Sequence, residues 1–260
     1  MHDILAKSSR GVLADFAYSN VLLGFDFDGT LAPIVAQPSR ARMRATTRRL
    51  LTRVAISYPC VVISGRTRGD LSNRLGRLPL WHLFGNHGLE PWAETKEALA
   101  QVRDWVRHLR RELDGHPGVV VQDKRYSVTV HYRHAPHPGR AHDVIVRVVA
   151  QLSNARVLEG DHAVNLLQRD GANKGEALQR SRQILACASA IYVGDDGVDE
   201  DAFGSGPAHE LLAIRVCKEN TSRARYYLRS QAHVDRLLRT LISMRSRGLE
   251  RRGKLPGSLP

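Results

Sequence analysis

The sequence predicts an α/β protein: a doubly wound, mostly parallel sheet with a smaller α+β unit inserted into it. Up to residue 95 and again after residue 170, short apolar runs alternate with helical patterns, as in parallel strands joined by right-handed crossovers. Between these parts, residues 96–170 have the pattern of two helices and several strands of alternating polarity. Because the strand–helix alternation resumes afterwards, the smaller unit is an insertion.

The first strand of the larger unit has the clearest pattern. Val21–Phe25 reads VLLGF and has the length and composition of a strand buried on both faces. A short amphipathic helix is expected before it, over residues 3–17. After it we expect a helix over 40–57, a strand over 60–64, a helix over 68–75 and a strand that ends in FGNHGLE at residues 84–90.

The inserted unit is expected to be a small antiparallel sheet with helices on one face. Helices are expected over 96–113 and 139–153, and strands over 119–133 (two), 155–158 and 163–168. In the strand that ends at Arg133, apolar and polar side chains alternate, so one face of this sheet is polar. Such a face either closes over a polar ligand as a lid or faces water.

The last part of the chain returns to the larger unit. We expect a helix over 174–187, strands over 190–193 and 211–216, and helices over 223–229 and 234–244. The predicted domains are a core (residues 1–95 and 171–244), an inserted cap (96–170) and a tail (245–260). The tail is basic, contains Gly and Pro and lacks periodicity, so we expect it to be disordered.

Composition restricts the class of protein. Of 260 residues, 42% are hydrophobic and 25% charged, as in ordinary globular proteins, and no apolar run approaches the ~20 residues that span a bilayer. The N-terminus lacks a secretory pattern, and the 3 cysteines lack metal-ligand spacing. We therefore expect a cytoplasmic protein with no membrane partner.

The net charge of +13 admits nucleic acid, an anionic small substrate or solubility alone as its explanation. The Lys and Arg residues are scattered over predicted helices and concentrated in the tail, without the spacing of RNA-binding or zinc-finger modules. We therefore expect a small anionic ligand and no nucleic-acid partner, and we expect a monomer.

Two carboxylates one residue apart directly follow the first strand. Asp26 and Asp28 stand where that strand ends, at the edge where open α/β sheets bind ligands. The Gly29–Thr30 turn leaves backbone N–H groups that can face an anion. Paired carboxylates need a compensating charge, which Mg²⁺ usually provides together with substrate phosphate oxygens. Two solvated acids at a strand end are the alternative.

Other polar groups stand at equivalent positions along the chain. A hydroxyl ends a predicted strand, a lysine begins a helix, and three carboxylates follow another strand: Ser64, Lys174, Asp195, Asp196 and Asp199. Together with the first two carboxylates they supply a nucleophile, an acid/base, a hydroxyl donor, a cation and a metal site. These are the groups that hydrolysis of a phosphate monoester requires.

The motifs FDFDGTL, ISGR, NKG and GDDGVDED resemble those of the haloacid dehalogenase superfamily. Within it, the segments DFDGTLAPI, GNHGLE, DKRYSVTVHYR, NKGEAL and DEDAF, spread over residues 20–242, are similar to those of trehalose-6-phosphate phosphatases. The resemblance implies a haloacid-dehalogenase-like Rossmannoid core with an inserted α+β cap. It also implies Mg²⁺-dependent hydrolysis of trehalose 6-phosphate to trehalose and inorganic phosphate through an aspartyl-phosphate intermediate.

The resemblance implies a role for each site residue. Asp26 would be the nucleophile and Asp28 the general acid and base, while Ser64 and Lys174 would bind the phosphoryl oxygens. The metal would be held by Asp26, the backbone carbonyl of Asp28 and Asp195, with Asp196 or Asp199 in addition. The sugar phosphate would be bound by Gly29, Thr30, Arg66, Asn86, His87, Glu90, Gln122, Lys124, Ser127, His131, Arg133 and Asn165, although a structural role for His87 is an equal alternative.

Three positions depart from the family's pattern. Gln122 and Asn165 stand where these enzymes usually have glutamates, and Val198 stands where they usually have threonine. The departures leave the phosphatase chemistry intact and the identity of the sugar open. The alternatives are a phosphatase for another glycosyl or sugar phosphate, and a catalytically idle module that binds a sugar phosphate.

Overall fold

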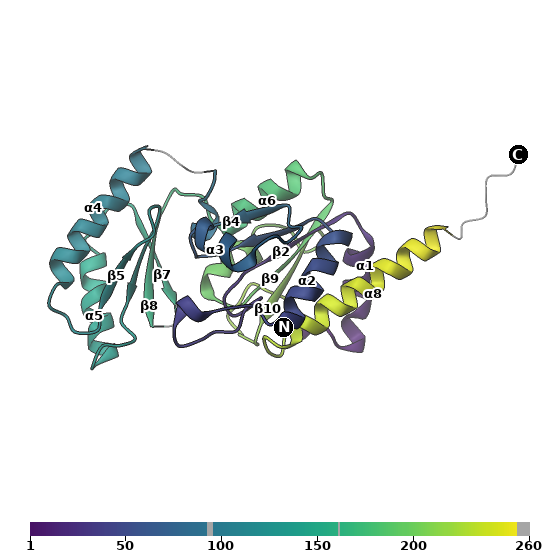
Figure 1. The fold of residues 1–260 in the computed structure, drawn as a ribbon, viewed down its shortest axis with the longest axis horizontal. Coiled ribbons are helices and arrows are strands. Elements are labelled where there is room, and N and C mark those ends of the chain that lie inside the picture. The colour runs from purple at the N-terminus through teal and green to yellow at the C-terminus, as the bar shows by residue number, and fades with distance from the viewer. Residues whose placement is uncertain (93–95, 161, 254–260) are drawn as a thin grey trace, which may run out of the picture.

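The computed structural model describes residues 1–92, 96–160 and 162–253 and contains two sheets (Figure 1). The larger sheet has 7 strands, which all pair in parallel. Their order is β1 (His2–Asp3), β11 (Tyr226–Leu228), β10 (Leu211–Val216), β9 (Ser189–Gly194), β2 (Val21–Phe25), β3 (Cys60–Ile63) and β4 (His82–Phe84). The predicted α/β class is thus confirmed.

Helices cover both faces of this parallel sheet (Figure 1). One face carries α1 (Arg10–Tyr18), α2 (Ala45–Ser57), α3 (Arg68–Leu75) and α8 (His233–Gly253), and the other carries α6 (Lys174–Ile184) and α7 (Glu200–Phe203). In β2, Leu23 and Phe25 join the first hydrophobic core and Leu22 the second. The strand is therefore buried along its whole length, which explains its continuous apolar sequence.

The second sheet belongs to a separate unit, residues 96–160 and 162–168, which we call the cap. Its antiparallel strands have the order β5 (Val120–Asp123), β6 (Val128–His131), β8 (Ala163–Gln168) and β7 (Ala155–Gly160). Helices α4 (Lys96–Leu113) and α5 (Pro138–Val149) pack on one face around Trp105, Leu109 and Ile145. The chain enters this unit after β4 and returns to the parallel sheet through α6.

The polar face of the cap sheet is turned to the core and not to water. Ser127 and Thr129, which lie on this face, are only 1% and 2% exposed. Of the two arrangements that the alternating pattern admits, the structure has the one in which the polar face is covered. The polar face of the cap sheet therefore lies over the carboxyl ends of the core strands, although Gln122 beside it remains exposed.

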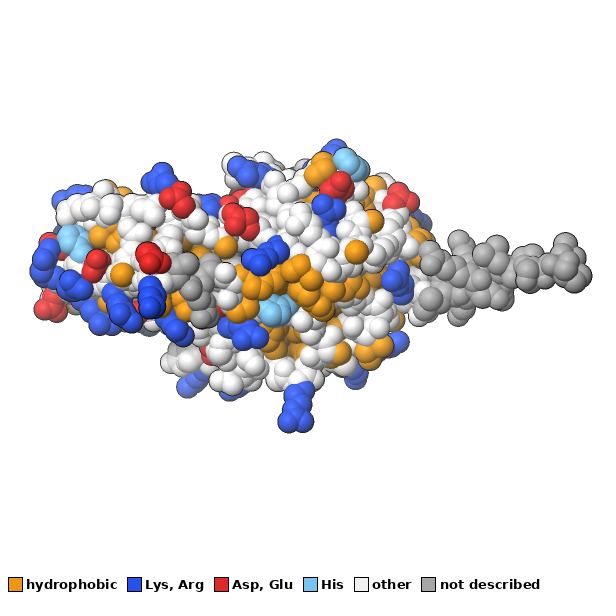
Figure 2. Space-filling model, turned by 90° about the horizontal axis from the view of Figure 1, so that it is seen from above, with side chains coloured by type: hydrophobic (Ala, Val, Ile, Leu, Met, Phe, Trp, Pro, Cys, Tyr) orange, Lys and Arg blue, Asp and Glu red, His pale blue; other side chains and the backbone are white. Residues whose placement is uncertain are grey.

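On the surface shown in Figure 2, Lys and Arg side chains lie over both the cap and the core, with acidic side chains between them. Hydrophobic side chains gather over the core on the same face. Among the described residues, no helix combines the length and the apolar character that crossing a membrane requires.

Three expectations about secondary structure are wrong. Residues 226–228 form the strand β11, paired with β10 and β1, where a helix was expected over 223–229. Two tyrosines and a leucine in succession fit a strand better than one helical turn. The N-terminal helix is shorter than expected, because β1 and a 3-10 turn at Lys7–Ser9 precede α1.

The third correction concerns the tail. Helix α8 continues to Gly253, so residues 245–253 are helical and not disordered; residues 254–260 lie outside the described part of the chain. Arg245 fixes this extension, because its guanidinium stacks 4.6 Å from the Tyr58 ring and donates to the carbonyls of Ala17 and Ser19. These partners lie far from Arg245 along the chain, so sequence periodicity could not predict the contacts.

Candidate active site

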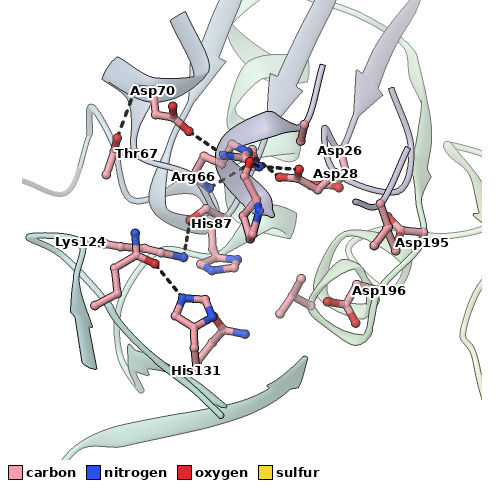
Figure 3. Close-up of a pocket in the computed structure, with 18 of the residues that line it drawn as sticks. Asp26, Asp28, Arg66, Thr67, Asp70, His87, Lys124, His131, Asp195 and Asp196 are labelled. Carbon is pink, nitrogen blue, oxygen red and sulfur yellow. Dashed lines mark hydrogen bonds and ion pairs between the residues drawn. The ribbon is translucent and has the colours of Figure 1, made fainter. Parts of the chain in front are cut away.

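The strand-end residues meet at one edge of the parallel sheet (Figure 3). Phe25 pairs with Val193 of β9 and with Val62 of β3, so the residues that follow these strands stand side by side. Asp26, Ser64 and Asp195 therefore line one cavity, together with Lys174 from the start of α6. Its volume is about 320 Å³.

A buried lysine joins two of the carboxylates. The Lys174 ammonium, 1% exposed, donates to Oδ1 of Asp26 and to Oδ1 of Asp199, both at 2.7 Å. Burial alone would lower the pKa of Lys174, but the two carboxylates outweigh it and raise the pKa. Lys174 is therefore a fixed positive charge that holds one oxygen of Asp26 in place.

Asp199 uses both carboxylate oxygens to shape the site. Oδ1 also accepts from the Tyr192 hydroxyl at 2.7 Å, and Oδ2 accepts from the backbone N–H groups of Asp195 and Asp196, both at 3.0 Å. With four donors on its two oxygens, Asp199 positions its neighbours. Asp196, in turn, caps the 3-10 turn at Gly197–Asp199.

The carboxylates also form a set that fits a divalent cation. Asp26, Asp195 and Asp199 each offer an oxygen, and these atoms lie within 4.8 Å of one another. Hard carboxylate oxygens are the ligands that Mg²⁺ prefers. Burial raises the pKa of Asp26 and of Asp195, and the nearby carboxylates add to this effect. A bound cation would remove this unfavourable concentration of negative charge.

Gly29 allows Asp195 to approach the first loop. Its φ is +79°, and a Cβ at this position would lie 1.8 Å from Oδ2 of Asp195, so only glycine fits. The Thr30 hydroxyl then donates to Oδ1 of Asp195 at 3.1 Å. The Gly29 N–H, which was expected to face an anion, instead donates to the Ala32 carbonyl at 2.8 Å.

Asp28 is held by arginine and does not point to Asp26 (Figure 3). Arg66 donates from Nε to Oδ2 and from Nη2 to Oδ1 of Asp28, at 2.6 and 2.7 Å. Arg66 also binds Asp70 at 2.8 Å, and Arg74 binds Asp70 in turn. Both oxygens of Asp28 thus accept charged hydrogen bonds, so in this arrangement Asp28 is a carboxylate and not a proton donor.

Side chains expected to bind sugar instead join the cap to the core. Ser127 of the cap donates to Oδ1 of Asn86 at 2.9 Å, and Asn86 donates to the Lys124 carbonyl at 2.9 Å. The Lys124 ammonium donates to the Gly65 carbonyl at 3.1 Å. Asn86 and Ser127 are buried, 0% and 1% exposed, and do not line the cavity. In this structure both side chains join the cap to the core.

A second set of contacts joins the cap to the core on its far side. Arg156 of β7 donates from both Nη atoms to the Asp201 carboxylate of α7, at 2.6 and 2.8 Å.

Glu90 was also expected to bind substrate, but it accepts from the Arg68 backbone N–H and lies outside the cavity. Neither contact could be inferred from spacing along the chain.

His87 remains a candidate for ligand binding. It lines the cavity but is 5% exposed, and neither ring nitrogen has a hydrogen-bond partner within the described ranges. Burial lowers its pKa well below the usual value, and Lys124 and Lys174 act in the same direction, so the imidazole is neutral. Gly65 makes room for the ring, because a Cβ there would lie 2.5 Å from Cε1 of His87.

Comparison with known proteins decides the family. The model of the trehalose-phosphatase family matches residues 24–232. The chain belongs to this family. It is 36% identical to the trehalose-phosphate phosphatase of Mycolicibacterium paratuberculosis over 77% of this chain and 56% of that protein. The chain thus spans just over half the length of this curated relative.

Solved structures of the trehalose-phosphatase family and its neighbours share the fold. The C-terminal domain of Candida albicans trehalose-6-phosphate phosphatase matches with a TM-score of 0.75 at 21% identity, over 90% of this chain and 96% of that chain. The C-terminal domain of the trehalose synthase regulatory protein of the same organism matches with a TM-score of 0.66 at 14% identity, over 86% of this chain. The haloacid-dehalogenase-like fold is thereby confirmed, but this likeness shows the fold alone.

The cavity also contains residues that were not among the site residues predicted from the sequence. Ile34, Val35, Pro38 and Ala41 form an apolar wall on the core side, and Ile34 is 61% exposed. Tyr192, which binds Asp199, is a further supporting residue. Five of the twelve expected sugar-phosphate contacts do not line the cavity, namely Gly29, Thr30, Asn86, Glu90 and Ser127, whereas Arg66, His87, Gln122, Lys124, His131, Arg133 and Asn165 do.

Proposed function

We propose that the protein is a Mg²⁺-dependent phosphatase that hydrolyses trehalose 6-phosphate to trehalose and inorganic phosphate through an aspartyl-phosphate. One observation carries this proposal: a strand-end carboxylate, Asp26, is fixed by Lys174 and belongs to a set of acids that could hold a metal ion, beneath the polar face of the cap. The relatives named trehalose-phosphate phosphatase support the choice of substrate.

In the first step, Asp26 attacks the phosphorus atom. Lys174 occupies Oδ1 of Asp26, so Oδ2 is the oxygen that forms the new P–O bond while the bond from phosphorus to the sugar oxygen breaks. The sugar oxygen takes a proton from Asp28 as it leaves. The products of this step are the free sugar and a phosphorylated Asp26.

In the second step, water attacks the phosphorus atom of the aspartyl-phosphate. Asp28, now a carboxylate, takes a proton from the water, the bond between phosphorus and Asp26 breaks, and inorganic phosphate leaves. Asp28 then carries the proton that the next leaving group needs. Its carboxylate form on Arg66 matches the state required for this second step.

The other residues bind and orient. Mg²⁺, held by Asp26 and Asp195, would offset the charge of the phosphate when bound. The Ser64 hydroxyl, at the end of β3, and the Lys174 ammonium would donate to the phosphoryl oxygens. The burial of Asp26 and Lys174 strengthens these charge interactions.

For Asp28 to act as an acid, it must give up at least one bond to Arg66. A phosphate group entering beside Arg66 competes for the same guanidinium donors. We therefore propose that substrate binding releases Asp28 towards the leaving oxygen. Arg66→Lys should then raise KM for the sugar phosphate, because a lysine ammonium cannot bind the entering phosphate in the same two-donor geometry.

A sugar-phosphate-binding module without catalysis is the alternative, because the fold also occurs in a regulatory protein. The test is inorganic phosphate release from trehalose 6-phosphate by the purified protein, with Mg²⁺ and with EDTA. The proposal predicts release with Mg²⁺ and none with EDTA. Binding of the sugar phosphate without release would favour the idle module, and release that continues in EDTA would exclude the metal.

A further inference from the structure

The two sides of the cavity differ in charge. The described carboxylates that line the cavity all come from the core. Three of them already have a cationic partner: Asp26 is paired with Lys174, and Asp28 and Asp70 are paired with Arg66. On the cap side the lining residues are Gln122, Lys124, His131, Arg133 and Asn165. None of these is acidic, so among the described residues the cap lines the cavity with amides and cations and with no carboxylate.

The amide of Gln122 is oriented by its neighbour. Its Oε1 lies 2.8 Å from Nε2 of His131. An amide oxygen can only accept, so His131 is the donor and carries a proton on Nε2 in this pair. Burial lowers the pKa of His131, and Lys124 and Arg133 act in the same direction. The amide oxygen thus already accepts one hydrogen bond, and the NH₂ group of Gln122 supplies the hydrogen-bond donors that can bind a ligand.

Asn165 is oriented in the same sense. The Thr129 hydroxyl donates to Oδ1 of Asn165 at 2.8 Å. Thr129 is 2% exposed, so its hydroxyl needs this acceptor. Asn165 therefore also presents an NH₂ group, and the two amides together place hydrogen-bond donors where a carboxylate would place acceptors.

Lys124 adds a positive charge to this side. Its ammonium donates to the Gly65 carbonyl, and within the described ranges no carboxylate lies within ion-pair distance of it. Burial lowers the pKa of Lys124 to about 8, with the like charge of Arg66 acting in the same direction. A nearby anion would stabilise the charged form.

We propose that the cap side of the cavity selects a phosphorylated glycoside that carries a second anionic oxygen group, a carboxylate or a further phosphate, on the part that lies under the cap. The NH₂ groups of Gln122 and Asn165 and the ammonium of Lys124 bind this group. This inference rests on the proposed phosphatase activity, and it replaces a neutral sugar by an anionic one as the preferred substrate class.

The test compares kcat/KM within matched pairs of substrates that differ by one anionic group. Suitable pairs are trehalose 6-phosphate with trehalose 6,6′-bisphosphate, and glucose 6-phosphate with glucose 1,6-bisphosphate. In at least one pair the anionic member should be preferred by ~10-fold or more, as expected for a charged hydrogen bond. Preference for the neutral member in every pair would overturn the inference.

Two isosteric variants locate the effect. Asn165→Asp and Gln122→Glu keep the oxygens that accept from Thr129 and His131, and replace each NH₂ by a negative oxygen. In the preferred pair, the double variant should reduce the anionic-to-neutral ratio of kcat/KM by ~10- to 100-fold. An unchanged ratio in a folded double variant would contradict the inference.

The matched control for Gln122→Glu is Gln151→Glu, which adds one negative charge to an exposed cap position outside the cavity; its ratio should equal that of the wild type. The two proposals fail in different ways. No turnover of trehalose 6-phosphate with turnover of an anionic substrate would overturn the proposed function alone. Turnover of trehalose 6-phosphate with no anionic preference would overturn the further inference alone.

Discussion

Lys174 shows how a single side chain can carry both stability and chemistry. Its ammonium lies between Asp26 and Asp199, and removing it leaves two buried carboxylates without their cation. Lys174→Met should therefore destabilise the metal-free protein by about 3 kcal/mol and abolish phosphate release. Urea unfolding in EDTA measures the first effect. The control Lys7→Met changes an exposed lysine and should cost little; equal stability of both variants would contradict this role.

A second residue-scale prediction concerns pH. Burial lowers the pKa of Lys124 to about 8; Arg66 also lowers this pKa, whereas Asp28 and Asp70 raise it. Lys124 is therefore charged below pH 8 and loses its proton as the pH rises through 8. The kcat/KM for a sugar phosphate, divided by that for para-nitrophenyl phosphate, should fall over this range. Lys124→Met should remove the inflection. A ratio independent of pH in the wild type would show that the ammonium does not touch the substrate.

At the scale of elements, β7 and α7 are held together by Arg156 and Asp201. The two side chains are 34% and 17% exposed, so solvent screens the pair and we expect a coupling of about 1 kcal/mol. A double-mutant cycle with Arg156→Ala and Asp201→Ala measures it in the free energy of unfolding. The same variants should raise KM for the sugar phosphate, because the cap closes less firmly. Additive effects on unfolding would contradict the coupling.

The elements also explain which features could be predicted. β2 and the carboxylates after it were predictable, since a strand buried on both faces is a continuous apolar run and its end is fixed in sequence. The strand at residues 226–228 was not predicted, because three residues are too few to show a strand's periodicity. The pairing of Asp28 with Arg66, the Asn86–Ser127 contact and the apolar wall at Ile34 depend on how the cap and the loop after β2 fold back. Local sequence does not encode these approaches.

At the scale of the whole molecule, metal binding and folding are linked. Burial and mutual repulsion raise the pKa of Asp26 and Asp195, so the metal-free folded protein retains protons that the unfolded chain releases above pH 4. Its stability should fall as pH rises towards 8. Because Mg²⁺ binds the ionised carboxylates, it should raise the unfolding temperature more at pH 8 than at pH 5.

Thermal unfolding with Mg²⁺ and with EDTA at both pH values tests this linkage. Asp195→Asn should lose most of the Mg²⁺ effect, whereas Asp104→Asn, on the exposed face of α4, should retain it. An equal Mg²⁺ effect at pH 5 and pH 8 would show that the ion does not bind at this carboxylate set.

The central claim is that Asp26 is the nucleophile, and one measurement tests it most directly: steady-state phosphate release from trehalose 6-phosphate by Asp26→Asn beside the wild type, both with Mg²⁺. The amide is nearly isosteric with the carboxylate but too weak a nucleophile for phosphate-ester hydrolysis. We predict no release above background by a folded Asp26→Asn protein. Release near the wild-type rate would contradict the aspartyl-phosphate mechanism.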